Sequence, residues 1–156
     1  MVRVRTAPPL PGITEAHLPR GYDDFKPPLL HFGWCFEEGA LVEWGAKVGI
    51  DTTARYSSGL CDGQIIEQPN CVWTVTEYDT MKILAEKAGT PDLKPEFALS
   101  VRASGNLIIA ISTNYRFLKD RKTISQARID AFSQYLKEQG IAKDPPQWYL
   151  DYDRYK

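Results

Sequence analysis

The chain has 156 residues, of which 43% are hydrophobic and 12% aromatic, and its formal net charge is −1. This composition can build the core of one domain, so it excludes disorder of the whole chain, and the balanced charge excludes a global field for steering nucleic acid or anionic membranes. The first residues lack the apolar run of a secretory signal, and no apolar stretch reaches the roughly eighteen residues that span a bilayer. The number of cysteines is odd, which does not suit the disulfide framework of a secreted protein. We therefore expect a soluble, cytoplasmic protein that binds neither nucleic acid nor membrane.

The first 28 residues are rich in proline, at Pro8, Pro9, Pro11, Pro19, Pro27 and Pro28. Proline fixes φ and removes a backbone donor, so neither a helix nor a central strand is expected there. We predict an extended arm over residues 1–28 that either wraps around the domain or hangs free. Within it, Arg5 to Pro11 matches the R-x-x-P-x-x-P pattern of polyproline ligands, although such short patterns also arise by chance.

A helix is predicted over residues 37–48, because Leu41, Trp44 and Val48 recur at the spacing of one helical face. Acidic residues at its start and a glycine after its end agree with the helix dipole and with a C-terminal cap. The polar stretch 51–63 is predicted to be a loop.

Two short strands are predicted next, over residues 64–67 and 72–78, with turn-forming residues between them. A second helix is predicted over residues 80–88, where apolar residues keep helical spacing. Asp79 or Thr80 can cap its start, and a glycine and a proline follow its end.

The clearest pattern is a hairpin. Residues 97–103 alternate in the period of a strand, and residues 104–106 have turn chemistry. Residues 107–111 are apolar on both faces, which indicates a strand in the centre of a sheet.

A third helix is predicted over residues 124–139, with Thr123 and Gln126 at the spacing of a capping box. These elements predict an α+β fold: a single domain over residues 29–143, with about four strands in a mainly antiparallel sheet and two or three packed helices. The strand order does not follow from the sequence.

Cysteine and histidine supply the candidates for catalysis or metal binding. Cys61 lies in a predicted loop, where catalytic groups are common, and His31 is one of two imidazole bases in the chain. His31 and Cys35 are close in sequence, but a zinc site usually needs two close ligand pairs. Buried packing explains the cysteines better than either role. We predict no metal and no cofactor, and keep Cys61 and His31 as candidate catalytic residues.

The segment between the central strand and the last helix is basic. Arg116, Lys119, Lys122 and Thr123 precede a helix N-terminus, where free amides favour anions. Arginine can give paired hydrogen bonds to a phosphate or carboxylate. The segment has no glycine-rich phosphate loop, so a P-loop nucleotide site is not indicated. Such a run is more often a solvated charged loop; a site for a small anionic ligand is the functional alternative.

The last residues, 144–156, form an aromatic tail. Trp148, Tyr152 and Tyr155 would share one face of a helix, next to Tyr149. Exposed aromatic area costs about 25 cal/mol per Å², and tyrosine and tryptophan are enriched in interface hot spots. These four residues predict a surface for a protein partner or a second copy of the chain, unless the tail packs on its own domain.

Two functions compete on these patterns. The first is a non-catalytic binding domain that presents its aromatic and proline-rich terminal segments to a partner or to itself. The second is a small enzyme or carrier that holds an anionic metabolite at the basic segment. The scarcity of histidine favours the first.

Overall fold

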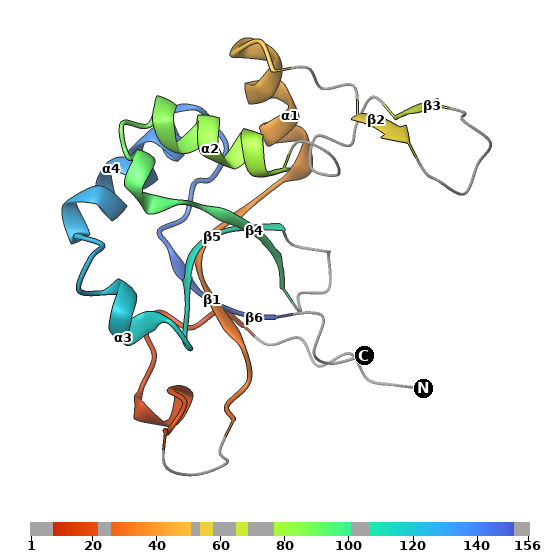
Figure 1. Ribbon diagram of the computed structural model, residues 1–156. Coiled ribbons are helices and arrows are strands. Elements are labelled where there is room, and N and C mark those ends of the chain that lie inside the picture. Colours follow the sequence, from red (N-terminus) through yellow and green to blue (C-terminus); the bar gives the residue numbers. More distant parts are fainter. Residues whose placement is uncertain are drawn as a thin grey trace.

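The computed structural model describes residues 8–21, 26–50, 54–57, 65–68, 77–100 and 107–151 (Figure 1). Four strands form an antiparallel sheet: β1 (Leu30–Phe36), β4 (Glu96–Leu99), β5 (Leu107–Thr113) and β6 (Gln147–Leu150). The order is β4-β5-β1-β6, which puts the two longest strands in the middle. A single bridge between Ser100 and Asp151 also joins the ends of the two outer strands.

The α-helices of the described residues are α1 (Glu38–Lys47), α2 (Glu77–Lys87), α3 (Phe117–Asp120) and α4 (Gln126–Glu138), with short 3-10 helices η1 (Glu15–His17) and η2 (Pro91–Leu93). In Figure 1, α1, α2 and α4 gather on one side of the sheet, and α3 follows the end of β5. This confirms the predicted α+β domain with a four-stranded antiparallel sheet. No helix in the described part of the chain is long and apolar enough to cross a membrane.

The three predicted helices are confirmed, with shifted ends. Helix α2 begins at Glu77 rather than at residue 80, so the end of the strand predicted over 72–78 is helical. Acidic residues in a first helical turn are stabilised by the helix dipole, which favours this earlier start. Helix α4 is capped by Ser125, whose side chain accepts a hydrogen bond from the Arg128 amide, and not by Thr123.

Part of the predicted loop over 51–63 is a strand, β2 (Ala54–Ser57). It pairs with β3 (Ile65–Gln68), close to the predicted strand at 64–67. These two strands form a sheet of their own and do not belong to the four-stranded sheet. Which strands share a sheet depends on contacts between residues distant in sequence, and local patterns therefore missed this division.

The aromatic tail is also a strand where the structure describes it. Residues 147–150 pair with β1 as β6, so the helical face predicted from Trp148 does not form. Successive side chains of a strand point to opposite faces, and Trp148 and Tyr149 do so, each only 3% exposed. Tyr152 and Tyr155 lie outside the described residues.

The main core lies between the sheet and the helices. Trp34 of β1 packs edge-on against Phe132 of α4, with ring centroids 5.0 Å apart. Two tryptophans of this core, Trp34 and Trp44, donate their indole N–H groups to hydroxyl groups. Trp34 donates to the Ser133 hydroxyl and Trp44 to the Tyr135 hydroxyl, each at 3.1 Å. Because a buried polar group without a partner costs stability, these bonds allow two tryptophans in one core.

A β-bulge interrupts the pairing of β1 with β5. Phe32 lies opposite Ser112 while Gly33 lies opposite Ala110, which leaves Ile111 as the extra residue. A Cβ atom on Gly33 would lie 1.9 Å from a backbone carbonyl oxygen of β5, so only glycine fits. The bulge matters for the site below, because it brings both Ile111 and Ser112 to the wall of one pocket.

The described parts of the proline-rich arm pack on the domain. Leu10 and Trp148 exchange two backbone hydrogen bonds of 2.9 Å, so Leu10 extends the sheet beyond β6. Asn114, which is 1% exposed, holds the arm through its side chain: it accepts from the Leu30 amide at 2.9 Å and donates to the carbonyl oxygens of His17 at 2.7 Å and Pro28 at 2.8 Å. Of the two predicted alternatives, the arm wraps the domain in this part of the chain.

Candidate functional site

A pocket of about 400 Å³ lies between the helix-bearing face of the sheet, α3 and the start of α4; we call it the α3 pocket. Its lining combines apolar and aromatic side chains with a few polar ones: Phe32, Ile111, Ser112, Phe117, Asp120, Arg121, Ile124, Gln126, Ile129 and Trp148. Such a lining is typical of small-molecule sites, whose volumes run from about 300 to 1,000 Å³.

Three aromatic rings form one wall of the α3 pocket. Trp148 lies directly opposite Phe32 in the pairing of β6 with β1, and their ring centroids are 5.0 Å apart. Phe117 of α3 meets Trp148 edge-on at 5.5 Å. The sheet therefore fixes two of the rings and α3 supplies the third, which gives a rigid surface for a flat apolar group.

The acidic group of the pocket is already engaged. The Asp120 carboxylate accepts a hydrogen bond from the Ser112 hydroxyl at 2.6 Å and from Arg116 Nε at 3.3 Å. Arg116 also lies 3.7 Å from Glu96, so its charge is shared between two carboxylates. Arg116 therefore offsets only part of this negative charge, and hydrogen bonds hold the Asp120 carboxylate in place before any ligand arrives.

Arg121 supplies a positive charge without such compensation. Its guanidinium carbon lies 5.9 Å from the centre of the Phe117 ring, a cation–π contact. None of the ion pairs found among the described residues involves Arg121. The pocket therefore has one cation that is available to a ligand, beside an aromatic wall.

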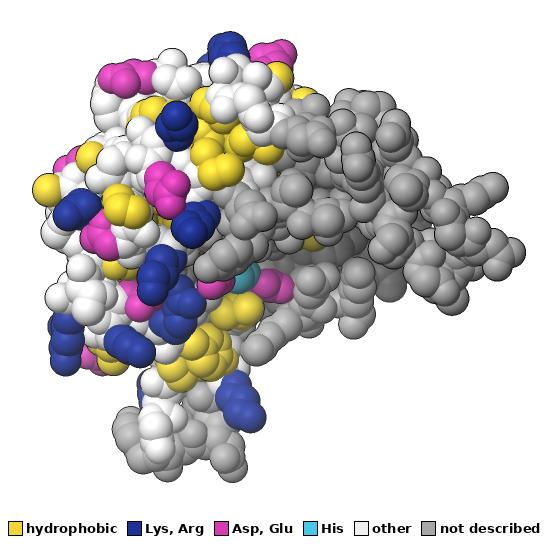
Figure 2. Space-filling view, turned by 45° about the horizontal axis from the view of Figure 1, so that its top comes forward, with side chains coloured by type: hydrophobic (Ala, Val, Ile, Leu, Met, Phe, Trp, Pro, Cys, Tyr) yellow, Lys and Arg dark blue, Asp and Glu magenta, His cyan; other side chains and the backbone are white. Residues whose placement is uncertain are grey.

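The predicted anion-binding residues surround this pocket but do not line it. Lys119 and Lys122 are exposed, Arg116 is bound to Asp120, and the Thr123 hydroxyl donates to the Asp120 carbonyl oxygen at 3.1 Å. On the face drawn in Figure 2, Lys and Arg side chains gather toward the lower left, next to hydrophobic side chains. The same basic segment thus contributes Arg121, which the sequence analysis did not select.

The structure brings together two segments that the sequence analysis treated separately. Trp148 of the predicted partner surface and Phe117 of the basic segment are in contact in one wall of the pocket. Tyr149, by contrast, is buried on the opposite face of the sheet. One visible pattern could have indicated the pocket: Phe117 and Arg121 are four residues apart, the spacing of neighbours on a helix.

The candidate catalytic residues do not meet at this site. His31 Nε2 lies 2.5 Å from the Asp151 carboxylate, and the two side chains are 14% and 15% exposed. His31 lies opposite Tyr149, on the face of the sheet away from the α3 pocket. Cys61 is outside the described residues. Within the described ranges, no three His, Cys, Asp or Glu side chains are grouped so that they could hold a metal ion.

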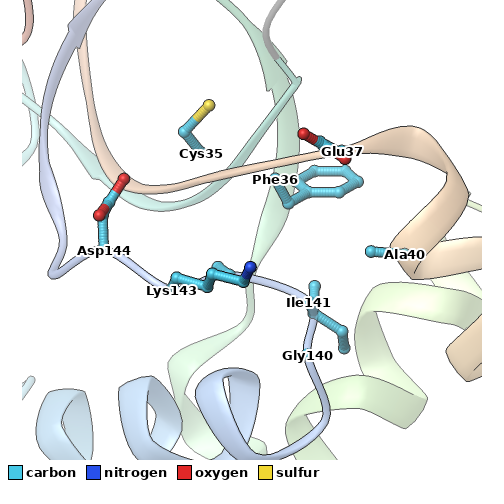
Figure 3. A pocket seen from close by; sticks show the side chains of 9 residues that line it. Cys35, Phe36, Glu37, Ala40, Gly140, Ile141, Lys143 and Asp144 are labelled. Carbon is cyan, nitrogen blue, oxygen red and sulfur yellow. The ribbon is translucent and has the colours of Figure 1, made fainter.

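A second hollow of about 300 Å³ lies where β1 leads into α1, beside residues 140–144 (Figure 3). Cys35, Glu37, Lys143 and Asp144 are among its lining residues. Figure 3 shows these four side chains spread around the opening rather than pointing at a common centre. This hollow therefore offers less selectivity for one kind of ligand than the α3 pocket, where the Arg121 guanidinium lies beside an aromatic wall.

Comparisons with known proteins found no matching family model, no similar curated protein and no similar solved structure.

Proposed function

We propose that this protein is a non-catalytic binding domain whose α3 pocket holds a small organic anion with a flat apolar body. The observation that carries the proposal is the position of Arg121, an exposed cation beside an aromatic wall that belongs to none of the ion pairs found among the described residues. An aromatic or alkyl-aromatic body would pack on the partly exposed ring of Phe117, behind which the Trp148 ring is buried. Its carboxylate, sulfonate or phosphate would accept hydrogen bonds from Arg121.

Binding without turnover agrees best with the described lining. The hydroxyl and carboxyl groups that could react, those of Ser112 and Asp120, are hydrogen bonded to each other. Among the residues that the structure describes, the lining contains no histidine, cysteine or lysine. A carrier of an anionic metabolite, which was part of the alternative hypothesis, would use the same pocket. We retain the cytoplasm as the expected compartment, on the odd number of cysteines.

A protein-partner surface has less support at Trp148 and Tyr149, because their side chains are buried against their own domain. Of the terminal segments, the arm and the residues around Tyr152 and Tyr155 would have to supply a surface for a partner or for a second copy. The small-ligand function therefore ranks first.

The test compares two dyes of nearly the same shape. Anilinonaphthalene sulfonate is an aromatic anion, and phenylnaphthylamine has the same aromatic body without the charge. We expect the anion to bind at one site per chain in isothermal titration calorimetry, and Arg121→Gln to weaken it about tenfold or more through the loss of a charge-assisted hydrogen bond. The neutral dye should be affected much less.

The matched control is Arg128→Gln, which removes an exposed arginine whose partner is Asp92, 2.8 Å away and outside the pocket lining. This variant should bind the anionic dye like the wild type. Equal affinities of the anionic dye for the wild type and for Arg121→Gln would contradict the proposal, and so would the absence of saturable binding.

A further inference from the structure

The arm is hydrogen bonded to Trp148, one of the residues that line the α3 pocket. Leu10 exchanges both backbone hydrogen bonds with Trp148, whose ring lies against Phe32 and Phe117 in the α3 pocket. Two hydrogen bonds of 2.9 Å fix the backbone of Trp148 on the edge that β1 does not cover. Docking of Leu10 therefore helps to fix the position of the Trp148 indole ring.

A second connection reaches the pocket from its other side. Asn114 binds the arm at His17 and Pro28, and the Tyr115 hydroxyl donates to the Pro27 carbonyl oxygen. Both residues follow the bulged end of β5, which supplies Ile111 and Ser112 to the pocket, and precede Phe117. The arm thus holds the two chain segments between which the ligand would lie.

We propose that the arm regulates the α3 pocket: the ligand binds tightly only while the arm is docked, and the bound ligand in turn holds the arm in place. This inference rests on the proposed ligand-binding function. The two events stabilise the same placement of Trp148, so their free energies are coupled, and the coupling must be the same in both directions.

The arm also has the composition of a ligand for proline-reading domains. The residues Pro8-Pro9-Leu10-Pro11 are part of the polyproline pattern, and Leu10 is half-buried where it pairs with Trp148. A proline-binding domain would hold this segment in an aromatic groove, and the segment could enter that groove only after it leaves β6. Partner binding at the arm would then empty the pocket, and a filled pocket would hide the arm.

The variant that tests the coupling is Leu10→Pro in the full chain. Proline removes the N–H group that donates to the Trp148 carbonyl oxygen, and it is otherwise tolerated at a sheet edge. The control is Gly12→Ala, because a Cβ at Gly12 meets no atom within 4 Å. We expect Leu10→Pro to bind anilinonaphthalene sulfonate about fivefold or more weakly than the wild type, the lower end of typical coupling, and Gly12→Ala to bind it unchanged.

The reciprocal measurement follows the arm by hydrogen exchange in the wild type. Leu10 has the only amide hydrogen in the segment 8–11, because its three companions are prolines, so a peptide from this region reports on the docking bond with little interference. Saturation with the anionic dye should slow this exchange by the same factor by which Leu10→Pro weakens the dye. If Leu10→Pro does not fold, Tyr115→Phe takes its place, since it removes one arm contact outside the pocket lining.

The results separate the two proposals. If dye binding does not depend on Arg121, the proposed function itself is wrong. If binding depends on Arg121 but Leu10→Pro, or its replacement Tyr115→Phe, binds as tightly as the wild type, the pocket stands and the coupling is refuted. Unchanged Leu10 exchange in the saturated wild type refutes it as well.

Discussion

Replacing the buried Asn114 should reveal how much the arm contributes to stability. The side chain makes three hydrogen bonds to backbone groups of the arm and of the start of β1, while its own exposure is 1%. Asn114→Ala leaves the buried Leu30 amide without an acceptor, at a cost of about 1–3 kcal/mol. The two carbonyl oxygens are partly buried and can recruit water, so each should add about 1 kcal/mol.

The free energy of unfolding should therefore fall by about 3–5 kcal/mol, the sum of these three losses. Urea unfolding followed by tryptophan fluorescence measures it, and with a slope of about 2 kcal/mol per M the midpoint would drop by about 2 M. The control is Gln134→Ala, which removes an exposed side chain that bonds only Glu138 on the same helix. It should change the stability by less than about 0.5 kcal/mol.

A second substitution separates lost hydrogen bonds from a lost side-chain volume. Asn114→Asp keeps the size and the acceptor for Leu30, but replaces the donor with an oxygen that faces the two carbonyl oxygens. It should cost at least as much as alanine at neutral pH. A loss below about 1 kcal/mol in either variant would show that the arm is not held in this way.

Further predictions concern local packing. Gly33→Ala should cost about 3 kcal/mol or more, because its Cβ would overlap a backbone carbonyl, whereas Gly39→Ala has free space and should stabilise by a few tenths to about 1 kcal/mol in thermal unfolding. Ser125→Ala should cost about 1 kcal/mol by removing the cap of α4, and Thr123→Ala clearly less, as measured by urea unfolding. Tyr135→Phe leaves a buried indole N–H without its acceptor and should cost about 1–3 kcal/mol in the same assay.

Local patterns predicted the fold class and the main helices because the residues that define a helix, its apolar stripe and its caps, are close together in sequence. The apolar stripe marks the buried face, and Gly89 and Gly140 stop α2 and α4 in a conformation with positive φ that other residues avoid. The strand β1 was missed although its pattern was present. Phe32, Trp34 and Phe36 alternate with smaller residues at the period of a strand.

The rest of the fold depends on contacts between distant residues. The tail resembles a helical face in sequence, but β1 imposes a strand on it by pairing with residues 147–150. The same pairing places Trp148 beside Phe32, more than a hundred residues away in sequence. The role of Arg121 depends on that arrangement, since its spacing from Phe117 is the one local feature that distinguishes it from the neighbouring Arg116, Lys119 and Lys122.

The most direct test of the α3 pocket follows the indole N–H signals of the tryptophans by NMR while anilinonaphthalene sulfonate is added. Trp148 lines the pocket, whereas Trp34 and Trp44 lie in the core with their N–H groups bonded to hydroxyls. Binding in the pocket predicts a saturable shift of the Trp148 signal, little change at the signals of Trp34 and Trp44, and the loss of the shift in Arg121→Gln. A Trp148 signal that stays in place while the dye binds, or that shifts equally in Arg121→Gln, would contradict the proposed site.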